Sequence, residues 1–341
     1  MHFLVTGHTG FKGAWLTLLL KKLGHEVSGI ALEPEEKSLF NQAKVGEFLL
    51  NDIRLDIRNQ SDFSKAVKRI EPDVAIHLAA QSLVREAYRN PTLTFETNVT
   101  GTLNFLHSTD ESKSVISRLI VTTDKVYKNK ISQVPFSEED ELGGSDPYSA
   151  SKAMADILTQ SWIKSVSAKP TMIARAGNVI GGGDYSYERL LPSLLDSYSQ
   201  NKIPVLRYPN AVRPWQHVLD CLNGYLLLLE NAHTKDLSRV WNIGPSLKDV
   251  KRVKEVAERI AINLGVNPVW EQDNNVEYIE QDWLVLDSSR IQSKLHWKEA
   301  LNFDSSVSWT CDWHTGIRSG KSALELCEKQ IEDYISLQSK K

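Results

Sequence analysis

The chain has 341 residues, with 40 basic and 43 acidic side chains and a formal net charge of −3. A chain of this length buries a sizeable core, either as one large domain or as two lobes that share a cleft. The nearly balanced charge, without a long basic run, excludes the usual electrostatic signs of a nucleic-acid or membrane partner.

The cysteines and the apolar runs bear on metal binding, cellular location and membrane insertion. The three cysteines are widely spaced and suggest neither a disulfide framework nor a zinc site, so we predict no metal and a reducing, cytoplasmic location. The chain opens directly on a strand pattern, and no targeting leader is expected. The leucine-rich run at 224–230 is too short to cross a bilayer and is expected to form a buried helix.

Short apolar runs alternate with amphipathic stretches along the first half of the chain. Strands are expected at 3–6, 26–30, 74–78, 119–122 and 171–175. Helices are expected between them, at 15–23, 61–69, 92–108 and 149–165. This alternation predicts an α/β fold, a Rossmann-type doubly wound parallel sheet, followed by a smaller mixed α/β lobe where the pattern becomes less regular.

A glycine-rich turn, "VTGHTGFKG", follows the first strand and precedes a helix. Glycine lets a pair of phosphates approach the backbone closely, and the amides at the helix start face the phosphate charge. The spacing G-x-x-G-x-x-G in this context predicts a dinucleotide site. The loop residues expected at the cofactor are Gly7, His8, Gly10, Phe11, Lys12 and Gly13.

The choice between NAD and NADP depends on the residues after the second strand. An acid about 20 residues beyond the loop often binds the ribose, and Glu33 is either this ligand or a solvated loop acid. No basic residue follows the second strand at once to hold a 2′-phosphate, which favours NAD. Other residues expected to lie against the cofactor are Asp56, which suits a turn equally well, Ile57, Leu78, Ala79 and Ala80.

Tyr148 and Lys152 are four residues apart in "DPYSASK". Pro147 stands where a helix is expected to begin, so both side chains should lie on one face of its first turns. A neighbouring ammonium favours the phenolate and lowers the pKa of the phenol, which predicts that Tyr148 acts as a base. Lys152 is also expected to hydrogen-bond the ribose of the cofactor.

The apolar run at 119–121 ends in Thr122, Thr123, Asp124 and Lys125. Ligands bind at the carboxyl ends of the strands in an open parallel sheet. We expect Thr123 to end the strand beside the one that carries the glycine loop, so that these groups face the same crevice as Tyr148. The alternatives are a turn cap for Asp124 and a solvated surface lysine for Lys125.

These motifs, with "ETNVTGT" around Asn98, "ARAGNVIGGGD" and "RPWQHVLD", resemble the extended short-chain dehydrogenase/reductase family over essentially the whole chain. More narrowly, they look like the CDP-glucose 4,6-dehydratases. Related dTDP-glucose and GDP-mannose dehydratases typically have a glutamate at the position of Lys125, and this difference, with His8 and Lys12 in the glycine loop, is the basis for the choice. The resemblance implies NAD and a CDP-glucose substrate. A dehydratase or epimerase for another nucleotide sugar is the alternative, and a catalytically silent NAD sensor is a rival from another class.

The resemblance also implies roles for individual residues. Tyr148 takes the proton of the sugar C4 hydroxyl while NAD accepts the hydride, and Asp124 protonates the departing C6 hydroxyl. Lys125 handles the C5 proton if its pKa is depressed, and otherwise stabilises the developing enolate. The expected catalytic residues are thus Thr123, Asp124, Lys125, Tyr148 and Lys152, with Asn98 on the cofactor side.

The substrate is expected to lie against the second half of the chain. Arginine recognises a diphosphate well through its planar fork. The expected substrate residues are Gln81, Asn178, Arg189, Arg213 and His217. Surface pairing is the alternative for Arg189, and a position at the edge of the core is the alternative for His217.

The expected division of the chain follows from these sites. We expect 1–176 to form the NAD-binding Rossmann domain and 177–341 mainly the nucleotide-sugar lobe, with 215–245 partly returning to the first domain. Relatives pair the helices at 92–108 and 149–165 across a two-fold axis, and both ranges carry apolar residues on more than one side. This pattern predicts a homodimer, although burial inside a larger monomer would explain it as well.

Overall fold

A computed structural model describes residues 1–130, 132–186, 189–273 and 281–339. Its centre is one parallel sheet of seven strands in the order β11-β6-β5-β4-β1-β2-β3. The strands are β1 His2–Thr6, β2 Glu26–Ala31, β3 Asn51–Arg54, β4 Val74–His77, β5 Ser117–Val121, β6 Thr171–Ala176 and β11 Val240–Ile243. The predicted Rossmann-type doubly wound sheet is confirmed.

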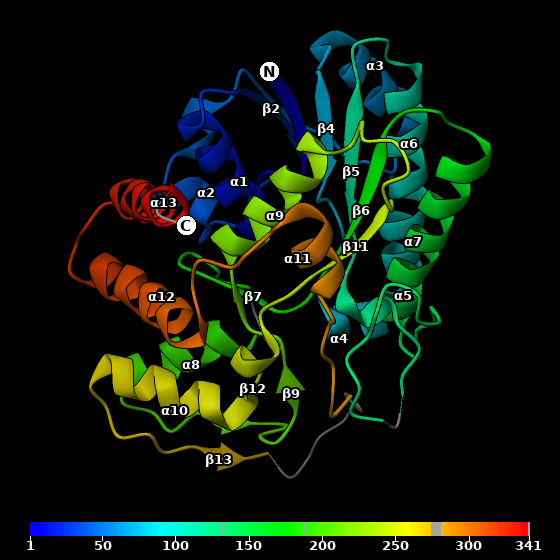
Figure 1. Cartoon of the computed structure of the whole chain (residues 1–341). Coiled ribbons are helices and arrows are strands. Elements are labelled where there is room, and N and C mark those ends of the chain that lie inside the picture. Colours follow the sequence, from blue (N-terminus) through cyan, green and yellow to red (C-terminus); the bar gives the residue numbers. More distant parts are fainter. Residues whose placement is uncertain (131, 187–188, 274–280, 340–341) are drawn as a thin grey trace.

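Helices cover both faces of this sheet, as Figure 1 shows. One face carries α3 Gln60–Ile70, α6 Gly101–Glu111 and α7 Pro147–Ser165, and the other carries α1 Phe11–Lys22 and α9 Val218–Glu230. Each face has its own apolar core, around Phe63 and Phe105 on one side and around Trp15 and Trp241 on the other. The leucine-rich run at 224–230 belongs to α9 and is largely buried, as expected.

The strand order corrects one expectation about the site. β4 lies between β1 and β5, so Thr123 does not follow the strand beside the glycine loop. Strands β3 and β11 were not expected at all. The sequence "NDIR" of β3 is short and polar because this strand forms an edge of the sheet, and β11 is contributed by the less regular second half of the chain.

A smaller lobe lies beyond the carboxyl ends of the strands, in the lower part of Figure 1. Its helices are α8 Leu190–Ser199, α10 Val253–Leu264 and α12 Phe303–Arg318. They share a separate core that includes Leu194, Ile260 and Val307. Three short strand pairs complete this lobe: β7 Val179–Ile180 with β10 Gln216–His217, β8 Val205–Leu206 with β13 Glu271–Gln272, and β9 Val212–Arg213 with β12 Lys251–Arg252.

The remaining helices pack mainly against the elements of the sheet domain. They are α2 Leu39–Gln42, α4 Val84–Arg89, α5 Pro91–Phe95, α11 Ser289–Leu295 and α13 Ala323–Ser339. The stretch expected as a helix at 92–108 contains α5 and α6, joined by a π-helical turn at Glu96–Thr100. Within the described ranges, no helix combines the length and the apolar character that a membrane crossing requires.

Candidate active site

The glycine loop between β1 and α1 touches the end of β4 backbone to backbone. Gly7 has a φ of +75°, and a Cβ on this residue would lie 2.8 Å from the Cα of Ala79. A Cβ on Gly13 would lie 2.2 Å from the carbonyl oxygen of Gly7. Helix α1 then begins at Phe11 without a side chain that caps its amides. The cradle therefore fits the phosphates of a dinucleotide, because its backbone is close and its helix amides are not capped by a side chain.

Side chains of the loop point in two different directions. Phe11 and Lys12 line a cavity at the carboxyl ends of the strands, which is described below. The Lys12 ammonium donates to the hydroxyl of Tyr225 at 3.3 Å. Burial lowers the pKa of Lys12. His8 is fully buried instead, with Nε2 2.7 Å from a carboxylate oxygen of Asp52. Its ring lies against Gly29 of β2, so the side chain of His8 packs beneath the loop and does not face the cofactor cradle.

The other residues expected at the cofactor divide into cavity walls and structural supports. Leu78 and Ala80 line the cavity at the end of β4. Asp56 accepts hydrogen bonds from the backbone and guanidinium of Arg58, as a turn residue does, and Ile57 is buried against Gly101. The packing of the Ile57 side chain therefore disfavours a direct contact with adenine.

The side chain of Asn98 links the loop after β4 to helix α7 by hydrogen bonds. Its amide nitrogen donates to the carbonyl of Gln81 at 3.0 Å and to Ser151 of α7 at 2.8 Å, and its oxygen accepts from the amide of Gln81 at 2.8 Å. The residue lies in the π-helical turn, a local irregularity that is common at functional sites. Because all its polar atoms are used, Asn98 shapes the loop after β4 rather than offering a free amide to a ligand.

A cavity of about 350 Å³ lies between the carboxyl ends of the strands and the smaller lobe. Thr123, Asp124 and Lys125 from the end of β5 line it together with Tyr148 and Lys152 from α7. The α7 residues are placed by the start of their helix, where Pro147 occupies the first turn and Asp146 accepts from the amide of Ser149 at 2.9 Å. All five residues expected to be catalytic therefore share one cavity.

Asp124 is held in a way that suits a proton donor. The carboxyl is buried, one oxygen accepts from the Thr123 hydroxyl at 2.9 Å, and the other has no partner in the described part of the chain. A Cβ on Gly177 would lie 3.0 Å from this second oxygen, so the absence of a side chain there leaves it room. Burial raises the pKa of Asp124, which favours the protonated acid.

The pKa values of Tyr148 and Lys152 differ from those expected from the sequence. Burial raises the pKa of Tyr148 to about 12, against the effect of a hydrogen bond with Thr123. Burial also lowers the pKa of Lys152 to about 7, with a smaller contribution from the charge of Lys12. The expected lowering of the Tyr148 pKa by a charged Lys152 is thus corrected. The reason is that burial of Tyr148 disfavours its phenolate, while the amine of Lys152 is also buried and donates to the carbonyl of Val121 at 2.8 Å.

The sequence profile of the NAD dependent epimerase/dehydratase family matches residues 3–244. The chain belongs to this family. It is 33% identical over 343 residues to a CDP-glucose 4,6-dehydratase of Salmonella typhimurium, covering 97% of this chain and 95% of the relative. It is 26% identical to a dTDP-glucose 4,6-dehydratase of Haemophilus influenzae, covering 92% of this chain and 98% of the relative.

A solved structure agrees with the fold of this epimerase/dehydratase. The dTDP-glucose 4,6-dehydratase of Streptomyces venezuelae, solved with NAD bound, superposes with a TM-score of 0.82 at 24% identity. The match covers 95% of this chain and 100% of that one. The predicted cofactor NAD is confirmed at the level of the family.

Three of the five residues expected to bind the substrate lie at the cavity. Asn178, Arg189 and Arg213 line it, and Arg213 is buried there. Arg189 also pairs with Asp184 at 3.2 Å and donates to Ser82 at 3.2 Å, so it reaches from the smaller lobe to the loop after β4. Arg189 therefore both lines the cavity, as expected, and forms an ion pair, which was the alternative expectation.

The other two expected substrate residues lie elsewhere. His217 is fully buried, accepts from the amide of Leu219, and packs against Trp15 and Trp309, so its core position is the correct alternative. Burial lowers the pKa of His217 to about 3, which keeps its ring neutral. The amide of Gln81 bonds to Leu83 and Thr94 within its own region, so a substrate contact by this side chain would require those bonds to break.

Several residues at the site were missed. Arg85, Arg207 and Gln281 line the cavity, although no motif in their surroundings singles them out. Arg54 of β3, which was not considered in the choice between NAD and NADP, reaches the carboxylate of Glu33 at 3.1 Å. Arg54 also pairs with Asp52, so its charge is matched by two acids. Within the described residues, no group of three or more His, Cys, Asp or Glu is arranged to hold a metal ion.

Proposed function

We propose that this protein is a nucleotide-sugar 4,6-dehydratase that converts CDP-glucose to CDP-4-keto-6-deoxyglucose with bound NAD. The observation that carries this proposal is the buried Asp124 carboxyl, which lines the same cavity as Tyr148 and keeps one oxygen without a partner in the described chain. Epimerisation needs the tyrosine, the lysine and a hydroxyl, whereas the loss of water also needs an acid and a base.

Tyr148 removes the proton of the sugar C4 hydroxyl. Its raised pKa means that the phenol must be made more acidic at the moment of reaction. Lys152 lies one turn further along α7, and its pKa of about 7 makes the charged and neutral amines comparably populated near neutrality. The glycine loop with Gly7, Gly10 and Gly13 would hold NAD, which would supply the hydride acceptor for C4 and the hydride donor for C6.

Asp124 and Lys125 carry out the elimination. A ketone at C4 acidifies the C5 hydrogen, which Lys125 takes up or whose enolate it stabilises. Asp124 gives its proton to the departing C6 hydroxyl, which leaves as water. The raised pKa of Asp124 keeps this proton available at a higher pH than in an exposed aspartate.

The preference for a cytidine nucleotide rests on the relative that is a CDP-glucose 4,6-dehydratase, at 33% identity. We assign the dinucleotide to the part formed by 1–176 and the nucleotide sugar mainly to 177–341. Asn178, Arg189 and Arg213 reach the cavity from that second part, and the two arginines are suited to the diphosphate.

The chain forms a homodimer in this proposal. Leu93, Leu103, Met154 and Ile157 on α5, α6 and α7 are exposed by 38%, 38%, 47% and 52% of their surfaces. Side chains of this kind on the outer face of neighbouring helices favour a two-fold pairing of those helices. The three cysteines are buried and unpaired, which supports the cytoplasm as the location.

The test is to incubate the purified protein with CDP-, dTDP-, UDP- and GDP-glucose and to follow the mass of each sugar nucleotide. We expect CDP-glucose alone to lose one water, without net accumulation of NADH. Dehydration of another nucleotide sugar in preference would overturn the cytidine assignment. A change of configuration without a change of mass would identify an epimerase, and no reaction with any donor would favour an NAD sensor.

A further inference from the structure

The buried carboxylate of Asp156 joins helix α7 to two strand ends of the site. Asp156 lies one turn after Lys152 and is completely buried. Each of its two oxygens accepts one bond from Arg175, at 2.9 and 2.8 Å, and one from a neutral side chain. The neutral donors are Thr122, at 3.0 Å, and Gln160, at 2.7 Å. No acceptor position of this carboxylate is left to solvent.

Two of the three partners of Asp156 lie at the edge of the cavity, since Thr122 lines it and Arg175 directly precedes Ala176, which also lines it. Thr122 precedes Thr123 and Asp124 at the end of β5, and its own amide donates to Ala174 of β6 at 2.8 Å. Arg175 of β6 stands two residues before Gly177, which faces the free oxygen of Asp124. The ion pair with Arg175 therefore connects the helix that carries Tyr148 to β6, and the hydrogen bond from Thr122 connects the same helix to the end of β5, which carries Asp124.

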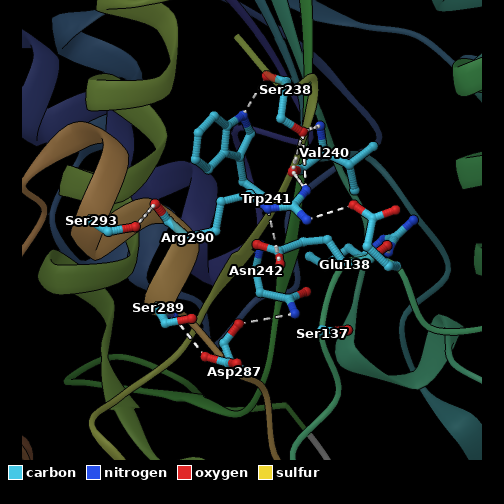
Figure 2. A network of polar contacts seen from close by, with 12 residues as sticks. Ser137, Glu138, Ser238, Val240, Trp241, Asn242, Asp287, Ser289, Arg290 and Ser293 are labelled. Carbon is cyan, nitrogen blue, oxygen red and sulfur yellow. Dashed lines mark hydrogen bonds and ion pairs between the residues drawn. The ribbon is translucent and has the colours of Figure 1, made fainter.

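The same arginine continues the network into the loop that follows Lys125. Its guanidinium donates to the hydroxyl of Tyr127 at 2.9 Å and to the carbonyl of Glu138 at 3.1 Å. Tyr127 in turn donates to Asn242 of β11 at 2.6 Å. Figure 2 shows Asn242 between Glu138 and Asp287, with Arg290 of α11 reaching Glu138. The catalytic segment, residues 122–128, is thus anchored to the sheet through Thr122 near one end and Tyr127 near the other.

We propose that Asp156 and Arg175 are positioning residues, which hold Asp124 at a fixed place relative to Tyr148 and Lys152 through the hydroxyl of Thr122. This inference rests on the proposed dehydration. A buried ion pair contributes little net stability compared with packed apolar residues, because both charges lose their hydration. Its benefit here is geometric, since the reaction requires groups on two separate elements to act on one sugar.

The two neutral donors to Asp156 provide a matched experiment. Thr122→Val and Gln160→Met each remove one hydrogen bond to the same carboxylate, but only Thr122 belongs to the catalytic segment. Thr122→Ser keeps the hydroxyl and serves as the rescue variant. Each NAD-loaded variant is assayed for kcat and KM, and hydrogen–deuterium exchange is measured for peptides that cover 119–128.

We expect Thr122→Val to lower kcat about tenfold with KM changed less than about twofold, since a small displacement of a catalytic group is costly. Amides at 122–126 should exchange faster in this variant. Gln160→Met should lose about as much stability as Thr122→Val, because each variant removes one hydrogen bond to Asp156, while kcat and the exchange at 122–126 stay as in the wild type. Thr122→Ser should recover most of kcat.

Two results would overturn the inference while the wild type still dehydrates its substrate. One is a wild-type kcat in Thr122→Val, and the other is an equal loss of kcat in Gln160→Met. A wild type that removes water from no nucleotide sugar would instead overturn the proposed function, and the exchange data would still show whether Thr122 orders the end of β5.

Discussion

The hydroxyl of Thr123 donates to one oxygen of the Asp124 carboxyl at 2.9 Å, and the second oxygen has no partner among the described residues. This relationship orients the free oxygen toward Gly177, whose missing side chain leaves space beside it. Burial and a raised pKa keep the carboxyl protonated to a higher pH than usual. This geometry suits the proposed role of Asp124 as an acid, because one oxygen is held and the other is left for a ligand.

Asp124→Asn should separate the two halves of the reaction. The amide keeps the shape of the carboxyl but cannot act as an acid, so we expect water loss to fall by about 10²-fold or more. Oxidation at C4, followed by the absorbance of bound NADH in a single turnover, should fall much less because Tyr148 and Lys152 are unchanged. If both steps fall equally while NAD binding and the fold persist, the role given to Asp124 is wrong.

Variants of Lys125 should distinguish its two proposed roles. In Lys125→Met, exchange of the C5 hydrogen with D2O and the rate of water loss should both fall, by about 10²-fold. Lys125→Arg keeps a positive charge but does not act as a base, so recovery in this variant identifies enolate stabilisation and continued loss identifies proton transfer. The control is Lys128→Met, an exposed lysine of the same segment that pairs with Glu141. Unchanged C5 exchange in Lys125→Met would exclude both roles.

Lys152→Met should stabilise the protein against unfolding near and below neutral pH. The pKa of Lys152 falls from 10.5 to about 7 on folding, so between these values the unfolded chain binds a proton that the folded chain lacks. Stability of the wild type therefore rises with pH across this window, and the full penalty of the buried amine is present below it.

The measurement is the free energy of unfolding of Lys152→Met and the wild type at several pH values. The variant should be more stable by a few kcal/mol at about pH 6, and the difference should shrink as the pH approaches 10.5. A difference that is independent of pH would show that packing rather than charge is responsible. Dehydration activity should be lost in the same variant.

The apolar surface on α6 and α7 should control the oligomeric state. Ile157→Glu places a charge in the proposed two-fold interface and should convert the dimer to a monomer in size-exclusion chromatography with light scattering. Ile262→Glu on α10 is the matched control, since this isoleucine is equally apolar and 59% exposed but lies in the smaller lobe. A monomeric wild type, or a dimer that survives the Ile157 change, would contradict the pairing.

Local sequence was sufficient where the chemistry depends on neighbours along the chain. The glycine spacing predicted a close backbone cradle, and Pro147 predicted the start of the helix that carries Tyr148 and Lys152. The polar end of the apolar run at 119–121 predicted that Thr123, Asp124 and Lys125 lie at the cavity. These features succeed because a turn, a helix start and a strand end are specified by a few consecutive residues.

Local sequence failed where burial or a distant strand decides. His8 and His217 stand in motifs of the site, yet both rings are buried in the core, where their contacts come from Asp52, Trp15 and Trp309. The pKa of Tyr148 was expected to fall and instead rises, because desolvation outweighs any effect of its neighbour on the helix.

The sequence alone therefore determined the fold class, the close backbone approach of the glycine loop and the five side chains of 123–125, Tyr148 and Lys152 that line the cavity, since each is encoded by residue type and short spacing. Tertiary structure alone decided the order of the strands, the partner of Glu33 and the convergence of Thr122, Asp156 and Arg175. These relationships join segments that are far apart along the chain. They depend on which strands pair and on which polar groups burial forces together, and no local pattern records either.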